Sequence, residues 1–329
     1  MPANLPPDYF EIEKRFRAAE TIEEKIEALQ EMMSVVPKHK GTDHLRADLR
    51  RKLAKLKEEA QSRKGAGRRD SAFRIPKAGA GQAVLVGPTN TGKSALMAAL
   101  TGAPAEVSSV PHTTWEPLPG MMPVEDVQVQ LVDTPPLSQD YVEPRLRELI
   151  RRADLVLLVV DLLEDPIAQL QEAAAILENY RIFPRHRPPR QAPAGGAITT
   201  LPFLVLVNKC DDEEGEELYK IFCELMEEPW PCLPVSALTG RNLERLKQEV
   251  LRNLNVIRVY TKAPGKEPDL HHPFVLKKGA SVAELAGKIH KDFLEKMKFA
   301  RVWGKGVYDG QMVQRDYLLQ DGDVVEIHI

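Results

Sequence analysis

Apolar residues in the middle of the chain fall into short runs separated by helical patterns. The apolar runs span residues 83–87, 127–133, 155–161, 203–208 and 232–236. Helical spacing follows them at residues 93–100, 143–152, 166–180, 213–226 and 242–254. Strands that are apolar at nearly every position, with helices between them, indicate a mostly parallel sheet covered on both faces. We therefore expect a doubly wound α/β domain over residues 83–260, interrupted by a Pro/Arg/Gly-rich loop at 181–200 that is mobile or functional.

Two helices are predicted before this domain. Thr21 and Glu24 have the spacing of a capping box, and apolar residues follow at helical intervals at Ile22, Ile26, Leu29 and Met33. After a break at residues 37–41, a second amphipathic series is formed by Leu45, Leu49, Leu53 and Leu56. The pattern predicts a helical hairpin over residues 1–64, followed by a basic linker at 65–82.

A smaller domain is predicted at the C-terminal end. Residues 261–272 are typical of a linker, and the segment 273–329 begins with a short strand pattern. Ser281 and Glu284 form a second capping box, and Asp321-Gly322 predicts a tight turn before a last strand. We expect one helix packed on a small mixed sheet. Its aromatic residues are candidates for the core or for partner binding: Phe299, Trp303 and Tyr308.

Composition narrows the class of protein. The 329 residues are 43% hydrophobic and 28% charged, as in ordinary globular domains. The longest strongly apolar run is six residues, Leu155–Val160, and the first residues lack a signal-peptide pattern, so we expect a cytoplasmic protein. The odd number of cysteines, Cys210, Cys223 and Cys232, without a CxxC pair, argues against a disulfide framework and a zinc site.

Charge is distributed unevenly along the chain. The net charge is −3 overall, but residues 45–80 carry +8 and residues 81–260 carry −9. This basic segment predicts contact with a polyanion such as ribosomal or other structured RNA, through Arg46, Arg50, Arg51, Lys55 and Arg63. The alternative is a solvated face whose long side chains cover apolar surface. Arg185, Arg187 and Arg190 carry a weaker form of the same hypothesis.

The segment Gly87-Pro-Thr-Asn-Thr-Gly92-Lys93-Ser94 is the strongest functional signal. It fits GxxxxGKS and lies between an apolar run and a helix. In such a loop, backbone N–H groups surround phosphates and the helix N-terminus adds positive potential. Lys93 is expected to bridge the β- and γ-phosphates as a catalytic residue, and Ser94 to ligate Mg²⁺. The other nucleotide contacts are expected from Gly87, Asn90, Thr91, Gly92 and Ala95.

Three further strand ends complete the predicted site. Asp133 ends the second run and can hold Mg²⁺ through its water shell. Asn208-Lys209-Cys210-Asp211 ends another run, where the Asp211 carboxylate can accept two hydrogen bonds from N1–H and the exocyclic amine of guanine. Adenine offers no such pair of donors. Ser236, Ala237 and Leu238 follow the next strand and would offer a backbone N–H to the guanine oxygen.

This set of motifs resembles the Obg family of P-loop GTPases, and within it the developmentally regulated GTP-binding (DRG) group. His112-Thr-Thr114-Trp-Glu-Pro is similar to the first switch of that group. The resemblance implies that Thr114, with Thr113 as the alternative, senses Mg²⁺ and serves catalysis. Residues 273–329, with Gln320-Asp-Gly-Asp-Val-Val-Glu-Ile, resemble its C-terminal TGS domain, a β-grasp module. Unlike DRG proteins, this chain has no extra domain between Asp133 and Asp161.

The second switch departs from the family pattern. In DxxG the glycine N–H bonds the γ-phosphate, but Asp133-Thr-Pro-Pro136 ends in a residue with no N–H. Leu137 follows, where many GTPases have a glutamine that positions water. We therefore expect slow intrinsic turnover unless a cation or a partner protein, acting as an activator, supplies the missing charge. Asn90 either helps to hold K⁺ for this purpose or stabilises the loop.

These residues predict a GTP-binding protein that slowly hydrolyses GTP in association with ribosomes or RNA. One alternative is a guanine-nucleotide-binding adapter with little or no hydrolysis, which Pro136 and Leu137 would explain. Another is a non-enzymatic RNA-binding scaffold in which nucleotide only stabilises the fold.

Overall fold

The computed structural model describes residues 12, 14–16, 22–36, 49, 52, 73–102, 116–139, 142–189 and 197–329. The chain divides into two compact units, Met1–Ala72 and Phe73–Ile329. No helix within these described ranges is long and apolar enough to cross a membrane.

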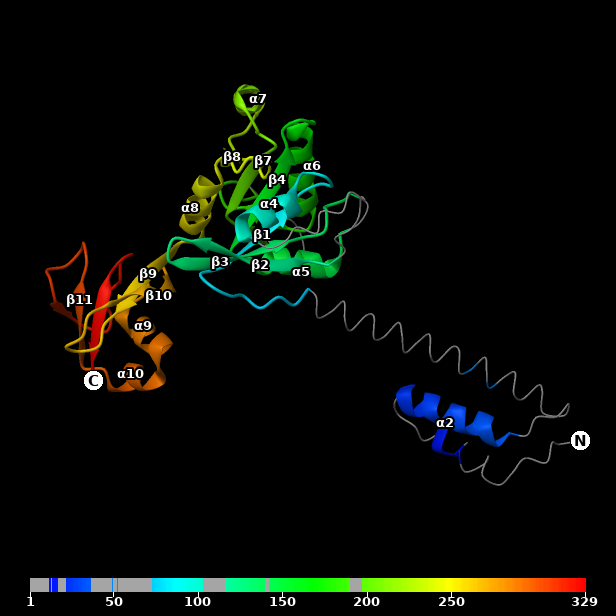
Figure 1. Cartoon of the computed structure of the whole chain (residues 1–329), viewed down its shortest axis with the longest axis horizontal. Coiled ribbons are helices and arrows are strands. Elements are labelled where there is room, and N and C mark those ends of the chain that lie inside the picture. The colour runs from blue at the N-terminus through cyan, green and yellow to red at the C-terminus, as the bar shows by residue number, and fades with distance from the viewer. Residues whose placement is uncertain are drawn as a thin grey trace, which may run out of the picture. The chain divides into compact units, whose positions relative to one another are not determined.

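The first unit contains the helix α2, Ile22–Val35, which begins directly after Thr21 as the capping box predicts (Figure 1). One face of α2 is buried through Ala28, Leu29 and Met32. Leu49 is buried in the same apolar cluster, as expected if a second helix packs on the first. Most of the predicted hairpin and residues 65–72 of the predicted basic linker lie outside the described residues, as do Arg46, Arg50, Arg51, Lys55 and Arg63, so these boundaries stay predictions. Residues 73–82 of that linker are described, and Gln82 is already the first residue of β1.

The second unit is built on a six-stranded sheet with the order β2-β3-β1-β4-β7-β8 (Figure 1). The strands are β1 Gln82–Val86, β2 Leu118–Val124, β3 Val127–Asp133, β4 Leu155–Asp161, β7 Phe203–Asn208 and β8 Cys232–Pro234. All neighbouring pairs are parallel except β2 with β3. Every residue of β1, β4 and β7 is buried, which explains why these strands have no polar face in the sequence. The predicted doubly wound α/β fold is confirmed.

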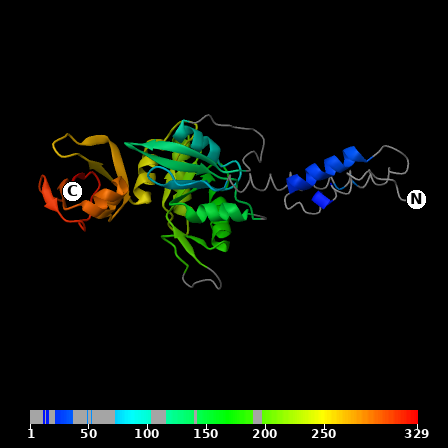
Figure 2. The ribbon, with the colours of Figure 1, turned by 90° about the horizontal axis from the view of Figure 1, so that it is seen from below.

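Helices cover both faces of this sheet. They are α4 Lys93–Thr101, α5 Pro144–Arg152, α6 Pro166–Asn179, α7 Glu213–Leu225 and α8 Leu243–Leu254. Apolar side chains of α4 and α8 pack in one cluster with β1, β3 and β4, and each fully buried aliphatic side chain contributes about 1.5–3 kcal/mol. The buried side chains of α6 lie outside that cluster although α6 contacts β4, so α6 covers the other face. In Figure 2 the cyan α4 and the green α5 lie on opposite sides of the strands.

Three strands of this unit escape the sequence pattern. β2 contains Pro119, Gly120 and Pro123, which are unfavourable in a central strand. They are tolerated here because β2 is the edge strand and pairs with β3 alone. The predicted loop at 181–200 contains β5 Ile182–Pro184 and the start of β6 Thr199–Leu201, which form a separate parallel pair too short to show periodicity.

The C-terminal sheet has the order β10-β9-β13-β11-β12. Its elements are β9 Val256–Thr261, β10 Asp269–Lys277, α9 Val282–Ile289, α10 Lys291–Lys296, β11 Phe299–Trp303, β12 Gln311–Val313 and β13 Val324–His328. The predicted boundary at 260, with a linker over 261–272, differs from this arrangement. β9 pairs with β10 and β13, so the second sheet begins directly after α8 and only residues 262–268 connect its first two strands.

The three aromatic candidates of this domain differ in exposure. Tyr308 is 86% exposed. Phe299 stacks on His328 with ring centroids 4.5 Å apart, and Lys262 Nζ lies 4.3 Å from the ring centroid of Trp303. Only Tyr308 therefore presents a large free aromatic surface among the three.

Arg258 of β9 connects the two sheets. Its guanidinium donates to Asp321 at 2.8 Å, to Asp126 at 3.0 Å and to Glu125, and the last two residues form the turn between β2 and β3. Tyr260 donates its hydroxyl hydrogen to Asp126. Burial acts to raise the pKa of Asp126, but the hydrogen bonds from Tyr260 and Arg258 outweigh it and lower this pKa below its ordinary value.

Candidate nucleotide-binding site

The topology creates a crevice at the end of β1. The chain passes from β1 to β3 on one side and then crosses through α5 to β4 on the other side of β1. In open α/β sheets, ligands bind at such a switch point, outside the carboxyl ends of the strands. The loop 87–92 leaves β1 at this point and enters α4.

Two positions of this loop require glycine, both because their φ angles are positive and because a Cβ would have no room. Gly87 has φ +152° and Gly92 has φ +86°. A Cβ at Gly87 would lie 2.3 Å from the backbone oxygen of Val159. A Cβ at Gly92 would lie 2.2 Å from Asn208 Nδ2. The glycines therefore allow the loop to approach β4 and β7 closely, and Gly92 brings the chain to the N-terminus of α4.

Lys93 is held inside the loop. Its side chain is 7% exposed, and Nζ donates to the backbone oxygens of Gly87 at 3.1 Å and of Pro88 at 2.5 Å. Burial lowers the pKa of Lys93 to about 8, although the charge of Asp133 acts to raise it. A cation held at this point, between loop carbonyls, is poised to exchange them for phosphate oxygens.

Ser94 and Asp133 form the second polar pair of the site. Ser94 Oγ donates to Asp133 Oδ2 at 2.5 Å. Among the described residues, the buried Asp133 Oδ1 has no hydrogen-bond partner. Burial raises the pKa of Asp133, and the hydrogen bond from Ser94 only partly offsets it. A buried carboxylate oxygen without a partner, beside a hydroxyl, is a donor set suited to Mg²⁺, which prefers oxygen ligands.

Asn208 joins the phosphate loop to the predicted base-binding segments. Its Nδ2 donates to the Thr91 backbone oxygen at 2.9 Å, and its Oδ1 accepts from the Ala237 N–H at 3.2 Å. Ser236 Oγ donates to Asp211 Oδ1 at 2.5 Å. The structure thus brings the phosphate loop to two segments that lie more than a hundred residues later in the sequence. The Ser236 hydroxyl also fixes the Asp211 carboxylate from one side.

The turn after β8 leaves one N–H group for a ligand. The N–H groups of Ser236, Ala237, Thr239 and Gly240 donate to Arg241 O, Asn208 Oδ1, Ser236 Oγ and Ser236 O, respectively. The Leu238 N–H is therefore the candidate donor to the guanine oxygen. The Leu238 side chain is 84% exposed, so it does not stabilise the core.

Sequence reasoning missed the role of Asp161. It is buried at the end of β4, forms an ion pair with Lys209 and accepts the Leu163 N–H at 3.0 Å. Lys209 has φ +67°, which directs the chain away from β7. The available signal was an Asp at the end of an apolar run, the same signal that identified Asp133.

Not every predicted residue can be placed. Thr113 and Thr114 lie outside the described residues, as does Arg190. Asn90 is exposed in the loop with φ +62°, and Ala95 lies in the first turn of α4. These positions are compatible with the predicted roles but add no contact to them.

The second switch begins with an unexpected contact. Leu137 donates its N–H to the Gly87 backbone oxygen at 3.1 Å, the same oxygen that accepts from Lys93. The Leu137 side chain is 5% exposed. The first N–H after Pro136 is thus bound to the phosphate loop itself.

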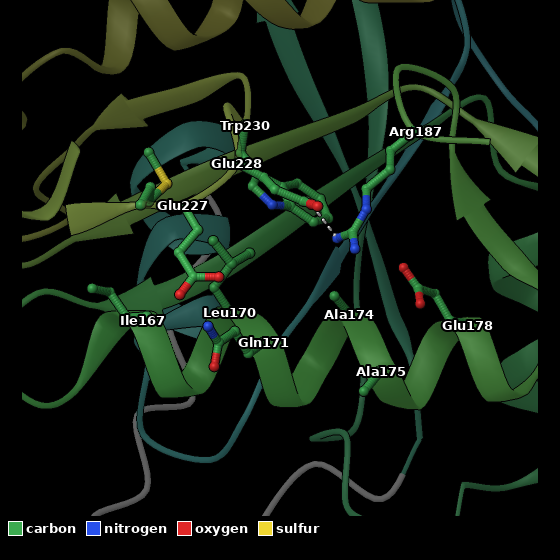
Figure 3. Close-up of a pocket in the computed structure, with 11 residues that line it drawn as sticks. Ile167, Leu170, Gln171, Ala174, Ala175, Glu178, Arg187, Glu227, Glu228 and Trp230 are labelled. Carbon is green, nitrogen blue, oxygen red and sulfur yellow. Dashed lines mark ion pairs between the residues drawn. The ribbon is translucent and has the colours of Figure 1, made fainter. Parts of the chain in front are cut away.

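A cavity of about 320 Å³ lies beside α6 (Figure 3). Its apolar lining includes Leu170, Ala174 and Trp230, and its rim carries an Arg187–Glu228 ion pair of 2.8 Å. Arg187 is therefore already paired with a carboxylate, which weakens its candidacy as an RNA contact. The helical spacing of α6 gave no sign of this cavity, because its other wall comes from residues 226–230.

Comparison with known families agrees with this geometry. Residues 82–189 match the model of a 50S ribosome-binding GTPase, and residues 257–329 match the TGS domain. The second match begins at β9, in agreement with the observed sheet. The Schizosaccharomyces pombe YchF GTPase has a similar fold, with a TM-score of 0.51 and 15% identity over 78% of this chain and 99% of that one.

Two relatives match nearly their whole length. An uncharacterized GTP-binding protein of Methanocaldococcus jannaschii is 32% identical over 94% of this chain and 93% of its own. Developmentally-regulated G-protein 3 of Arabidopsis thaliana is 29% identical over 93% and 98%, respectively. The chain belongs to the DRG-type GTP-binding proteins of the Obg family of P-loop GTPases, with a C-terminal TGS domain.

Proposed function

We propose that this GTPase binds GTP and GDP at the carboxyl end of β1 and slowly hydrolyses GTP in the cytoplasm, in association with ribosomes or RNA. The observation that carries the nucleotide assignment is the Asn208 side chain, which holds the phosphate loop and the base-binding turn together. Asp211 selects guanine, and the Leu238 N–H donates to its oxygen. Lys93 binds the terminal phosphates.

Ser94 and Asp133 are proposed to hold Mg²⁺, together with Thr114 from the first switch. Bound Mg²⁺ would neutralise phosphate charge and orient the nucleotide. Support comes from the partnerless Asp133 Oδ1 and its short contact with Ser94. Lys93 supplies a further positive charge next to this carboxylate, so the chain itself favours an anionic ligand at the loop.

Turnover is proposed to be slow because the second switch lacks two polar groups. Pro136 has no N–H for the γ-phosphate, and Leu137 can neither donate nor accept through its side chain. The Leu137 N–H, bound to Gly87, does not replace the missing donor. K⁺ held with the help of Asn90, or a partner protein, would supply the missing charge.

The same observation favours the adapter alternative. If the second switch does not respond to the γ-phosphate, the two nucleotides produce nearly the same conformation and hydrolysis has little effect on partners. Measured phosphate release separates the adapter from the slow GTPase.

Ribosome association rests on two observations. The family model that matches residues 82–189 is described as a 50S ribosome-binding GTPase. Residues 45–80 carry a net charge of +8, which suits RNA phosphates. The surface of α7 is instead acidic, with exposed carboxylates at Glu213, Glu214, Glu217 and Glu224. We therefore assign the RNA contact to the basic segment at residues 45–80.

Asp211→Asn should reduce GTP and GDP affinity about a hundredfold, because an amide cannot accept both guanine hydrogen bonds. It should also raise affinity for xanthosine diphosphate, whose carbonyl replaces the exocyclic amine. Equilibrium titration measures both effects, and steady-state phosphate release from GTP and ATP, in KCl and in NaCl, measures turnover. Unchanged base preference would overturn the assignment of Asp211.

Asp212→Asn is the matched control. Asp212 caps α7 by accepting the Gly215 N–H at 2.8 Å, and asparagine preserves that role. This variant should bind guanine nucleotides normally.

Phosphate release that is equal in KCl and NaCl would exclude the cation role proposed for Asn90.

Pro136→Gly should strengthen discrimination between a non-hydrolysable GTP analogue and GDP by about ten- to a hundredfold. The restored N–H adds one charge-assisted hydrogen bond to the γ-phosphate, worth about 1.5–3 kcal/mol. Affinities for the two nucleotides provide the measurement. Pro135→Gly is the control, because it loosens the backbone equally without restoring this N–H, and it should leave the ratio of the two affinities unchanged. Equal affinity ratios in the unmodified chain, Pro136→Gly and Pro135→Gly would contradict the proposal.

Nucleotide binding should take up protons near pH 8. With a pKa of about 8, half of the Lys93 side chains are neutral at that pH, and phosphates favour the ammonium form. Binding of GDP should take up about half a proton at pH 8 and about a tenth at pH 7, so affinity declines as the pH rises above 8. Calorimetry in buffers of different ionisation enthalpy measures this uptake.

Lys220→Gln is the control for this measurement, because Lys220 is exposed on α7. Its proton uptake should equal that of the unmodified chain. Zero uptake at pH 8 in both proteins would show that burial does not hold the Lys93 pKa near 8.

Ribosome binding should depend steeply on salt. The chain should co-sediment with ribosomes at low salt and dissociate as the salt concentration rises, because phosphate contacts release counterions. Arg50→Glu with Arg51→Glu should weaken binding at least tenfold. Arg152→Glu with Lys220→Glu changes the net charge equally at two exposed positions and should bind normally. Absence of binding at low salt would remove the ribosome proposal.

A further inference from the structure

Two of the three cysteines lie side by side. Cys223 Sγ, near the end of α7, is 3.9 Å from Cys232 Sγ, the first residue of β8. Both side chains are half-buried, whereas Cys210 is fully buried elsewhere. The Tyr219 hydroxyl lies 3.2 Å from Cys232 Sγ and donates to the Cys232 backbone oxygen at 3.3 Å. The helix end, the strand start and this tyrosine therefore form a closed sulfur-containing cluster.

We propose that Cys223 and Cys232 form an oxidant-sensitive dithiol site, which closes to an intramolecular disulfide and thereby slows the release of bound guanine nucleotide. A disulfide has an S–S distance of about 2.05 Å, so the two sulfur atoms must approach by roughly 2 Å, within reach of side-chain rotation and a small shift of the α7–β8 loop. Disulfides in reducing compartments are typically transient and redox-sensing, which fits a pair that remains partly accessible.

The oxidant is a peroxide. One thiol reacts with hydrogen peroxide to give a sulfenic acid and one water molecule. The second thiol then displaces hydroxide from that sulfenic acid, its proton completes a second water molecule, and the S–S bond forms. Two thiols are thus oxidised and one peroxide is reduced to two waters. Burial raises the pKa of Cys232 to about 11, so we assign the first step to Cys223.

The bridge would connect elements that lead to the proposed base-binding site. α7 begins immediately after Asp211 and Asp212, and β8 leads to Ser236. At the nucleotide end, Ser236 already binds Asp211, and Cys210 N–H binds the Val235 backbone oxygen at 3.1 Å. A covalent link between Cys223 and Cys232 would close this unit at its other end. Since release of the base requires local opening here, a bridge that restricts opening slows release; this consequence rests on the proposed function.

The same bridge would restrict one wall of the cavity beside α6. Glu227, Glu228 and Trp230, which line it, lie in the segment between the two cysteines (Figure 3). The Arg187–Glu228 ion pair attaches that segment to the β5 side of the cavity. Ring closure therefore acts on a loop that is held by this ion pair, by the packing of Trp230 with Phe203 and His186, and by a hydrogen bond of 2.8 Å from the Val205 N–H to the Pro231 backbone oxygen.

The test treats the folded, GDP-loaded full chain with hydrogen peroxide and then blocks free thiols. Residues 221–241 form one tryptic peptide that contains both cysteines, because Lys220 and Arg241 flank it, while Cys210 falls in another. This peptide should lose the mass of two hydrogen atoms, and denatured protein should titrate one thiol instead of three. Reduction with dithiothreitol should reverse both changes. A peptide without this mass loss, or a bridge that includes Cys210, would overturn the proposal.

Release of a fluorescent GDP analogue measures the consequence. It should be at least threefold slower from the oxidised chain than from the reduced chain, and Cys223→Ser and Cys232→Ser should each abolish the difference. A bridge without slower release would overturn the coupling. If neither form binds the nucleotide, the proposed function fails while the mass measurement still decides the dithiol site. Two serine variants are made so that release can still be measured on one of them if the other does not fold.

Discussion

The close approach of Asn208 to the phosphate loop is the constraint on which the site depends. Its carboxamide donates to Thr91 O and accepts from Ala237 N–H, so one side chain sets the distance between the phosphate loop and the turn at Ser236–Leu238. This position is available only because Gly92 has no Cβ, which would otherwise lie 2.2 Å from Asn208 Nδ2. The glycine thus serves the packing of the loop against β7 as much as the curvature of the loop itself. Buried polar side chains that are fully satisfied in this way fix one geometry, because each lost bond leaves an unpaired group.

Much of this architecture could be predicted from the sequence because the buried strands have no polar face. β1, β4 and β7 coincide with apolar runs that are buried throughout. β3, β4 and β7 each end in a polar residue at the site: Asp133, Asp161 and Asn208. Where burial is one-sided or pairing is limited to an edge, the signal fails. The prolines in β2 made its sequence unlike a strand, although an edge strand tolerates them. The structure begins the C-terminal sheet before residue 260, because β9 follows α8 with a single intervening residue.

The details of the site depend on contacts that no linear pattern contains. The motif at 235–238 predicts a backbone donor, but only the three-dimensional hydrogen-bond pattern shows that four neighbouring N–H groups are occupied and that the Leu238 N–H remains. Likewise, the sequence shows that Pro136 lacks a backbone N–H donor, but it does not predict the hydrogen bond from the Leu137 N–H to Gly87 O. That bond matters because it attaches the second switch to the loop through a protein acceptor.

The strand β3 connects two parts of this unit through the residues at its ends. Its carboxyl end carries Asp133, which contacts Ser94, and its amino end follows the turn of Glu125 and Asp126, which Arg258 of the C-terminal domain binds. Between these ends the strand is almost completely buried and pairs with β1 and β2 along its length, which resists local bending. A change at Asp133 large enough to shift β3 would therefore displace its far end and disturb the bonds from Arg258 and Tyr260 to Asp126. Because Arg258 also binds Asp321 within the TGS domain, the same displacement would act on that domain directly. No long chain of contacts is therefore needed to connect the two sites: one strand has the carboxylate proposed to bind Mg²⁺ at one end and the contact with the C-terminal domain at the other.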